Sequence, residues 1–165
     1  MRNTITIERS VRLDAGAGPV WDAVRTPQAF RTVTRGVLRF PAIARRDAEW
    51  VEGEEVVGWT WLFGVVPFNR HHLTVARIDH DRMTLASDEH GGMIRSWRHD
   101  IVVEADGAHA CRYTDRVEID AGPMTLPVAA YAWWFYRVRQ RRWVRLARGL
   151  ARGPGSGTAR DRAGA

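Results

Sequence analysis

The chain has 165 residues, 45% of them hydrophobic, which fits one domain with a sizeable buried core. It has no run of 18 apolar residues to predict a membrane-spanning helix, and a single cysteine, Cys111, excludes an internal disulfide and a thiolate metal cluster. The net charge of +6 is local, because residues 125–152 hold seven arginines and no acidic residue.

The first part of the chain predicts a strand followed by two short helices. Residues 3–13 alternate between polar and apolar side chains, as half-buried strands do. Pro19 opens a helix over residues 19–25, and Thr26 is the expected N-cap of a second helix that ends near residue 33. Because no apolar signal-peptide core precedes this strand, we expect a cytoplasmic location.

Four further strands are predicted at residues 36–40, 55–65, 69–79 and 82–88, with an irregular segment at 41–53. The alternation in 55–65 places Trp59 and Trp61 on one face, which we expect to be the inner face. His71 and His72 are consecutive and must face opposite sides of their strand, so they cannot share one metal ion. His71 shares the expected inner face with Leu73, and no metal site is predicted.

The last two strands form a long hairpin between residues 93 and 120, and both place ionisable residues on the apolar face. The odd positions include Arg95, Trp97 and His99 in one strand and Tyr113 and Asp115 in the other. With a three-residue loop, His99 lies directly opposite Asp115, and a register two residues away leaves them diagonal neighbours.

Two interpretations of the His99–Asp115 pair remain open. The pair is either a satisfied structural contact between strands or a general base whose imidazole is oriented by a carboxylate. Arg95 has the same inward parity, so it either binds an anionic group of a ligand or reaches solvent at the rim of a cavity.

A long helix is predicted over residues 126–150, with Trp133 and Tyr136 in its apolar stripe. Another face carries arginines, for which three interpretations stay open: a solvated face, contact with a membrane surface, or contact with a nucleic-acid backbone. No groove-reading motif accompanies these arginines, so nucleic acid is the least favoured partner. The arginines are at positions 137, 141, 145, 148 and 152.

The order of elements predicts an α+β fold with a single domain over residues 1–152. A curved antiparallel sheet must bury its inner face against the C-terminal helix, and such a sheet leaves an apolar cavity beside the helix. The segment 153–165 is poor in apolar residues and is predicted to be a disordered tail.

Several segments resemble the SRPBCC, or START-like, superfamily, which includes polyketide cyclases and pollen allergens and has the helix-grip fold. The similarity covers residues 3–150 and rests on the order and spacing of segments. The segments that carry it are Ile7–Val11, Pro19–Val24, Ser96–His99, Tyr113–Val117 and Phe135–Arg139.

The resemblance implies a deep apolar pocket for lipids, polyketides or other hydrophobic molecules, without a metal or organic cofactor. We therefore expect the protein to bind a small hydrophobic or aromatic molecule, with polyketide cyclase, aromatase or dehydratase activity as a further possibility. The alternative is a non-catalytic module whose arginine-rich helix contacts an anionic surface. The expected catalytic residues are His99, Asp115 and Arg95, and the expected ligand-binding residues are Trp59, Trp61, His71, Trp97, Tyr113 and Trp133.

Overall fold

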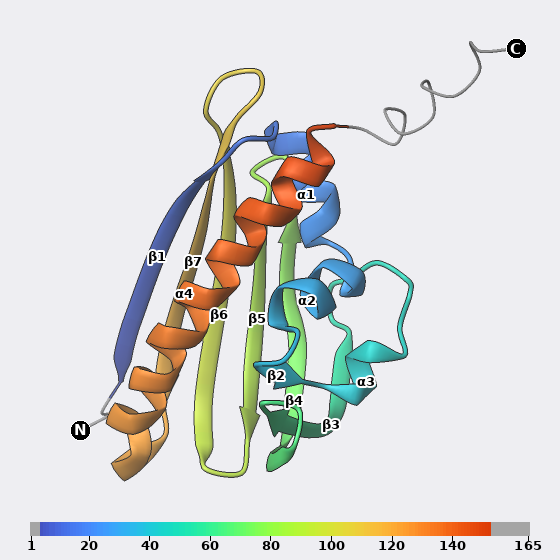
Figure 1. The fold of residues 1–165 in the computed structure, drawn as a ribbon. Helices are drawn as coiled ribbons and strands as arrows, with labels where there is room; N and C mark the ends of the chain where they lie inside the picture. The colour runs from blue at the N-terminus through green and yellow to red at the C-terminus, as the bar shows by residue number, and fades with distance from the viewer. Residues whose placement is uncertain (1–3, 153–165) are drawn as a thin grey trace, which may run out of the picture.

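Seven strands form one antiparallel sheet in the order β1-β7-β6-β5-β4-β3-β2 (Figure 1). The computed structural model describes residues 4–152, so the tail predicted at 153–165 lies outside the described residues. The strands are β1 (Ile5–Leu13), β2 (Leu38–Arg39), β3 (Glu55–Leu62), β4 (Val66–Asp79), β5 (Thr84–Gly91), β6 (Ile94–Ala105) and β7 (Cys111–Asp120).

Two short helices, α1 (Ala17–Val24) and α2 (Pro27–Thr34), connect β1 to β2 at the opposite edge of the sheet. The predicted N-cap is confirmed, because the Thr26 hydroxyl accepts a hydrogen bond from the Ala29 amide at 3.2 Å. The segment after β2, predicted to be irregular, contains one further helical turn, α3 (Pro41–Ala44).

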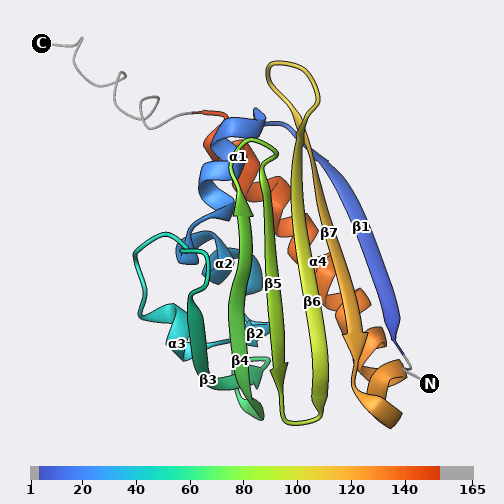
Figure 2. The ribbon, with the colours of Figure 1, turned by 180° about the vertical axis from the view of Figure 1, so that it is seen from behind.

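The long helix α4 (Thr125–Leu150) follows a short 3₁₀ turn, η1 (Gly122–Met124), and lies across the concave face of the sheet (Figure 1). Viewed from behind, the convex face of the sheet is free of helices (Figure 2). The predicted α+β helix-grip fold is therefore confirmed. The helix buries a stripe at helical spacing: Ala132, Tyr136, Arg139, Trp143 and Ala147.

The β6–β7 hairpin differs from the predicted register by two residues. Its strands are joined by a five-residue connection, since Ala105 pairs with Cys111, and His99 is opposite Val117. Asp115 is opposite Ile101, one position further along the same face. The side chains still meet as diagonal neighbours, because residues two apart in a strand share a face.

The orientation predicted for β3 is wrong, because Trp59 and Trp61 are on the convex face. The inward positions hold smaller residues, including Gly58, against which α3 packs. A Cβ atom at Gly58 would lie 2.9 Å from the Ala42 Cβ and 3.1 Å from the Phe40 ring. Close packing of α3 against β3 thus requires small residues inside and leaves the large aromatic residues outside.

Candidate ligand-binding cavity

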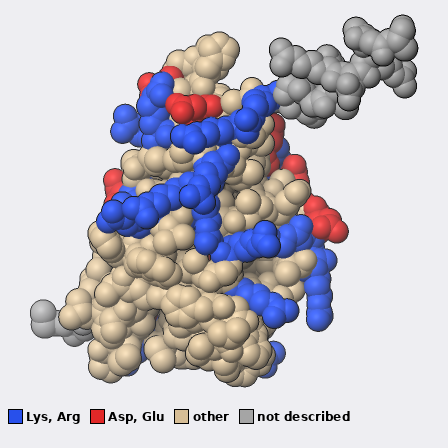
Figure 3. Space-filling view, viewed as in Figure 1, with Lys and Arg blue, Asp and Glu red and all other residues tan. Residues whose placement is uncertain are grey.

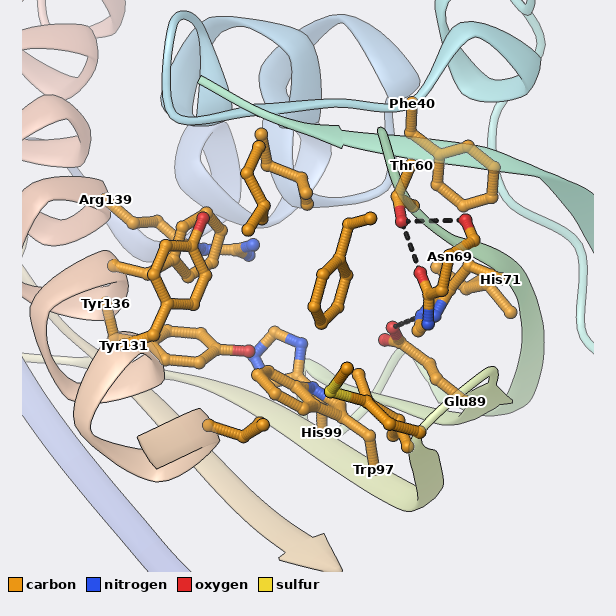
Figure 4. Close-up of a pocket in the computed structure, with 18 of the residues that line it drawn as sticks. Phe40, Thr60, Asn69, His71, Glu89, Trp97, His99, Tyr131, Tyr136 and Arg139 are labelled. Atoms are coloured by element: carbon orange, nitrogen blue, oxygen red, sulfur yellow. Dashed lines mark hydrogen bonds and ion pairs between the residues drawn. The ribbon is translucent and has the colours of Figure 1, made fainter. Parts of the chain in front are cut away.

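A cavity of about 300 Å³ lies between the concave face of the sheet, α2 and the first half of α4 (Figure 4). It separates the part of the core that contains Val117 and Phe135 from the part that contains Phe40 and Leu73. Its lining residues are Phe30, Leu38, Phe40, Thr60, Leu62, Phe68, Asn69, His71, Leu73, Glu89, Met93, Ile94, Trp97, His99, Met124, Pro127, Val128, Tyr131, Phe135, Tyr136 and Arg139.

Aromatic rings form much of the wall. Trp97 stacks with Tyr136 at a centroid distance of 6.3 Å, and Tyr136 meets Phe135 edge to face at 5.1 Å. Phe40 meets the His71 ring in the same way at 6.0 Å on another part of the wall. These contacts hold the rings in defined orientations, so the wall presents flat apolar surfaces to the interior.

One wall holds a buried polar network that joins β6, β7 and α4. His99 Nε2 lies 2.9 Å from Asp115 Oδ1, and the Tyr113 hydroxyl donates to the same oxygen at 2.9 Å. Arg139 Nη2 donates to the Tyr113 hydroxyl at 3.0 Å, and its Nε lies 3.5 Å from Asp115 Oδ1. Within this network His99 and Arg139 line the cavity, while Asp115 and Tyr113 support them from behind.

The ionisation of Asp115 fixes the role of each His99 nitrogen. Burial raises the pKa of the Asp115 carboxyl, but the Arg139 charge and the hydrogen bond from His99 outweigh it, so that pKa lies below its ordinary value. An ionised carboxylate only accepts hydrogen bonds, so His99 Nε2 carries a proton. In the neutral imidazole the lone pair is then on Nδ1, and the His99 side chain is part of the cavity lining.

Arg139 is a cavity residue that the sequence pattern did not single out. It was counted among the arginines of the helix, but it is only 5% exposed and its ion-pair partner is Asp115. The signal was present in its spacing, since Arg139 stands three residues after Tyr136 and four before Trp143 in the buried stripe.

A second polar cluster lies on β4 and β5. It contains Glu89, which the sequence analysis did not predict as a site residue. Glu89 Oε2 lies 2.7 Å from His71 Nε2, and Ser87 Oγ donates to Glu89 Oε1 at 2.7 Å. Burial raises the pKa of Glu89, but the hydrogen bond and charge of His71 outweigh it, so that pKa is lowered. Two histidine–carboxylate pairs therefore belong to the cavity wall, His99–Asp115 and His71–Glu89. Figure 4 shows the second pair, with a dashed line between its members.

These lowered pKa values predict loss of stability in acid. A carboxyl with a lower pKa in the folded state binds protons preferentially in the unfolded state, so stability falls as pH drops through the folded pKa. We expect the melting temperature of the wild-type protein to fall below about pH 4.5, the ordinary pKa of Glu89. Thermal unfolding between pH 6 and pH 3 measures this fall. The melting temperature of Glu89→Gln should depend less steeply on pH than that of the wild type.

The control for this prediction is Glu8→Gln, because Glu8 is exposed on β1. It should follow the wild-type curve throughout the pH range. A Glu89→Gln curve that is parallel to that of the wild type would contradict the assignment of acid sensitivity to the buried carboxylates.

The structure distributes the predicted site residues over three environments. His71, Trp97 and His99 line the cavity. Tyr113 and Asp115 are buried behind its wall. The remaining predicted residues are not part of the lining: Arg95, Trp59, Trp61 and Trp133.

The inward orientation predicted for Arg95 is wrong, and Arg95 is exposed. At this end of β6, the segment that follows β7 turns at Gly122, whose φ of 57° is in the left-handed region. A Cβ atom at Gly122 would lie 2.7 Å from Arg95 Cζ, so the guanidinium occupies the space beside this turn. Trp133 is likewise outside, 47% exposed, with the Arg9 guanidinium 5.3 Å from its ring centroid.

Within residues 4–152 no three His, Cys, Asp or Glu side chains are grouped so that they could hold a metal ion. In the same part of the chain, no helix has the length and apolar character needed to span a bilayer.

Comparison with known proteins gives one family and a set of related folds. The family described as "Domain of unknown function (DUF8410)" matches residues 11–150. No curated protein matches the chain in sequence.

Solved structures match over most of the chain at low sequence identity. The Zhui aromatase/cyclase from Streptomyces sp. R1128 has a TM-score of 0.71 and 12% identity, covering 93% of this chain and 99% of its own. Norcoclaurine synthase from Thalictrum flavum, in complex with dopamine and hydroxybenzaldehyde, has a TM-score of 0.66 and 12% identity, covering 90% and 88%. A START superfamily protein from Mycobacterium smegmatis has a TM-score of 0.62 and 11% identity, covering 88% and 98%. These similarities confirm the helix-grip fold.

Proposed function

This chain belongs to the DUF8410 family, and we propose that it binds a small hydrophobic or aromatic molecule in the cavity between sheet and α4. The ligand is of the polyketide or lipid class, planar, and carries at least one hydroxyl, keto or enol group. The protein requires no metal or organic cofactor for this binding.

The observation that carries this proposal is the shape and lining of the cavity. Its volume of about 300 Å³ is at the lower end of the range for small-molecule sites, which favours a compact ligand over a long acyl chain. Flat apolar surfaces from Trp97, Phe135 and Tyr136 suit a planar ring system. Few polar groups reach the interior, and such groups orient a ligand rather than supply most of its binding free energy.

His99 determines where the polar group of the ligand binds. Its Nδ1 lone pair accepts a hydrogen bond from a hydroxyl or enol, while Asp115 holds the ring by Nε2. Arg139 lines the same wall and donates hydrogen bonds to a carbonyl or enolate oxygen. A hydroxylated aromatic ring placed against Trp97 satisfies both the apolar surface and this polar group.

The same pair supports a second candidate function, proton abstraction from the ligand. A histidine oriented by an ionised carboxylate is suited to remove the acidic proton of a poly-β-keto chain, as cyclisation or dehydration requires. Arg139 lines the cavity beside this pair and would stabilise the negative oxygen that forms. The fold similarity to an aromatase/cyclase agrees with this candidate.

Native mass spectrometry of the freshly purified protein tests the binding proposal. We expect a discrete adduct of low mass, released by organic extraction and identified by its fragmentation. If the protein has only its apo mass and acquires no adduct with aromatic polyketides, the proposal is refuted. A co-purified long-chain lipid would contradict the preference for a compact ligand.

Replacing His99 tests how the ligand is oriented. We expect His99→Ala to weaken binding of 2-naphthol by about 5- to 10-fold, the worth of one hydrogen bond. Binding of naphthalene, which has no hydroxyl, should be unchanged. Calorimetric titration measures both affinities, and His72→Ala is the matched control because His72 is on the convex face of strand β4, outside the cavity. Equal losses for the two probes, with lower stability, would mark His99 as structural.

A further inference from the structure

The solvent-facing stripe of α4 is divided along its length into an apolar half and an arginine half. Residues spaced by three or four positions share one face of a helix. The exposed stripe begins with Leu126, Ala130, Trp133 and Trp134, and continues with Arg137, Arg141, Arg145 and Arg148. Two tryptophans and a leucine on a solvent-facing stripe leave a large apolar area in water.

The apolar half continues onto the neighbouring strands and forms what we call the apolar end. Figure 1 places the start of α4, the β3–β4 hairpin and the β5–β6 turn at the same end of the domain. Phe63 joins the hairpin to the helix, with its ring 5.9 Å from that of Trp134. The exposed residues of the apolar end are Phe63, Val65, Val66, Met93, Met124, Leu126, Trp133 and Trp134.

The four arginines of the stripe, Arg137, Arg141, Arg145 and Arg148, form an arginine band beside the apolar end. Figure 3 shows arginine side chains running across the α4 side of the domain, above a lower region of mostly uncharged residues. Within residues 4–152, none of the four makes a salt bridge with an acidic side chain. Their positive charge is therefore available to an anionic partner.

We propose that the face formed by the apolar end and the arginine band binds the surface of an anionic lipid bilayer. Tryptophan and aliphatic side chains of the apolar end insert at the boundary between headgroups and acyl chains, where tryptophan is favoured. The arginine band contacts the anionic headgroups, each arginine near such a surface strengthening binding about fivefold. Neither half would bind strongly alone, and their position on one face lets them act together.

Two other occupants fit this face less well. A nucleic acid would contact the arginine band but would leave the apolar end in water. A second copy of the chain, paired through the same face, would cover the apolar end, but its α4 has no acidic residue to offer the arginine band. A bilayer with anionic headgroups matches both halves.

The mouth of the cavity lies within this face. Met93 and Met124 are each 43% exposed and also line the cavity, so they stand at its opening. If the proposed function is correct, docking places this opening against the bilayer, and an apolar ligand can pass between membrane and cavity without crossing water.

Sedimentation with lipid vesicles tests the electrostatic half of the proposal. The full chain should bind vesicles of 70% phosphatidylcholine and 30% phosphatidylglycerol, bind pure phosphatidylcholine vesicles far more weakly, and bind less in high salt. The variant Arg141→Glu/Arg145→Glu should lose roughly 25-fold or more in affinity for the anionic vesicles. The control Arg98→Glu/Arg112→Glu changes the net charge equally on the convex face and should bind as the wild type does.

A second pair of variants tests the apolar half. Val65→Asp places a charge in the apolar end, whereas Val51→Asp places one at a similarly exposed position outside it; their exposures are 74% and 62%. Val65→Asp should weaken binding to the anionic vesicles by about 10-fold or more, and Val51→Asp by much less. All four variants should keep the wild-type affinity for 2-naphthol, which separates this proposal from that of ligand binding.

Three results would overturn the proposal. The first is absence of binding to anionic vesicles at low salt. The second is salt-dependent binding to a short RNA or DNA duplex with none to vesicles, which would assign the face to nucleic acid. The third is a dimer in light scattering that Val65→Asp converts to monomer, with vesicle binding equal in all variants.

Discussion

Replacing Arg139 by methionine is expected to lower the free energy of unfolding by about 3–5 kcal/mol, the typical effect of removing one partner of a buried ion pair. The variant keeps an unbranched apolar stem but leaves the buried Asp115 carboxylate without its cationic neighbour. It also removes the donor to the Tyr113 hydroxyl. Equilibrium unfolding in urea at pH 7 measures the change.

The control is Arg141→Met, two positions along α4 on the exposed side, where a change within about 0.5 kcal/mol is expected. The pH dependence adds a second criterion. In Arg139→Met the Asp115 carboxyl protonates more readily, so the difference from the wild type should shrink as pH falls towards 3. If Arg139→Met is as stable as Arg141→Met at pH 7, Arg139 does not compensate the charge of Asp115.

Filling the cavity is expected to have the largest effect on ligand binding. Leu62→Trp adds an indole ring to the cavity wall and should weaken binding of 2-naphthol by roughly 100-fold or more, because the ring occupies the space that the probe needs. Calorimetric titration measures the loss. Thermal unfolding should show that the variant remains folded, since the added ring enters an existing cavity of about 300 Å³.

The matched control is Val57→Trp on the same strand, because residue 57 faces the convex side of β3 opposite His72. It adds the same ring outside the cavity and should leave the affinity for 2-naphthol within about twofold of the wild-type value. Equal losses in Leu62→Trp and Val57→Trp would show that the probe does not bind in the cavity.

The contact between His99 and Asp115 could be predicted from the sequence because it depends only on strand parity. Residues on one face stay on that face when the register moves by two. The predicted contact is therefore correct, although the loop has five residues and not three. The helix-grip fold could be predicted for a similar reason, since the order of strands and helices leaves few ways to bury one face of the sheet.

The positions of Trp59, Trp61 and Arg95 could not be predicted, because they depend on contacts between distant segments. The orientation of β3 is set by α3 packing on Gly58, and that of Arg95 by the turn at Gly122. The local alternation of polar and apolar residues does not indicate either contact. Composition alone favours the large aromatic residues inside, although close packing there requires the small ones.

Arg139 and Glu89 were missed for a different reason. Charged residues are almost never fully buried unless paired, so an arginine in a basic helix is assigned to solvent by default. Recognising Arg139 as buried requires its place in the stripe between Tyr136 and Trp143 to be considered together with the partner Asp115, 24 residues earlier. The partner becomes evident only when the fold brings α4 across β7.

The most direct test of ligand binding in the cavity is a crystal structure of the protein soaked with 6-bromo-2-naphthol. We predict an anomalous bromine peak inside the cavity, with the rings against Trp97 and Phe135 and the hydroxyl within hydrogen-bonding distance of His99 Nδ1. A bromine peak only on the outer surface of the domain, or no peak in the cavity at saturating probe, would contradict the assignment of the cavity as a binding site.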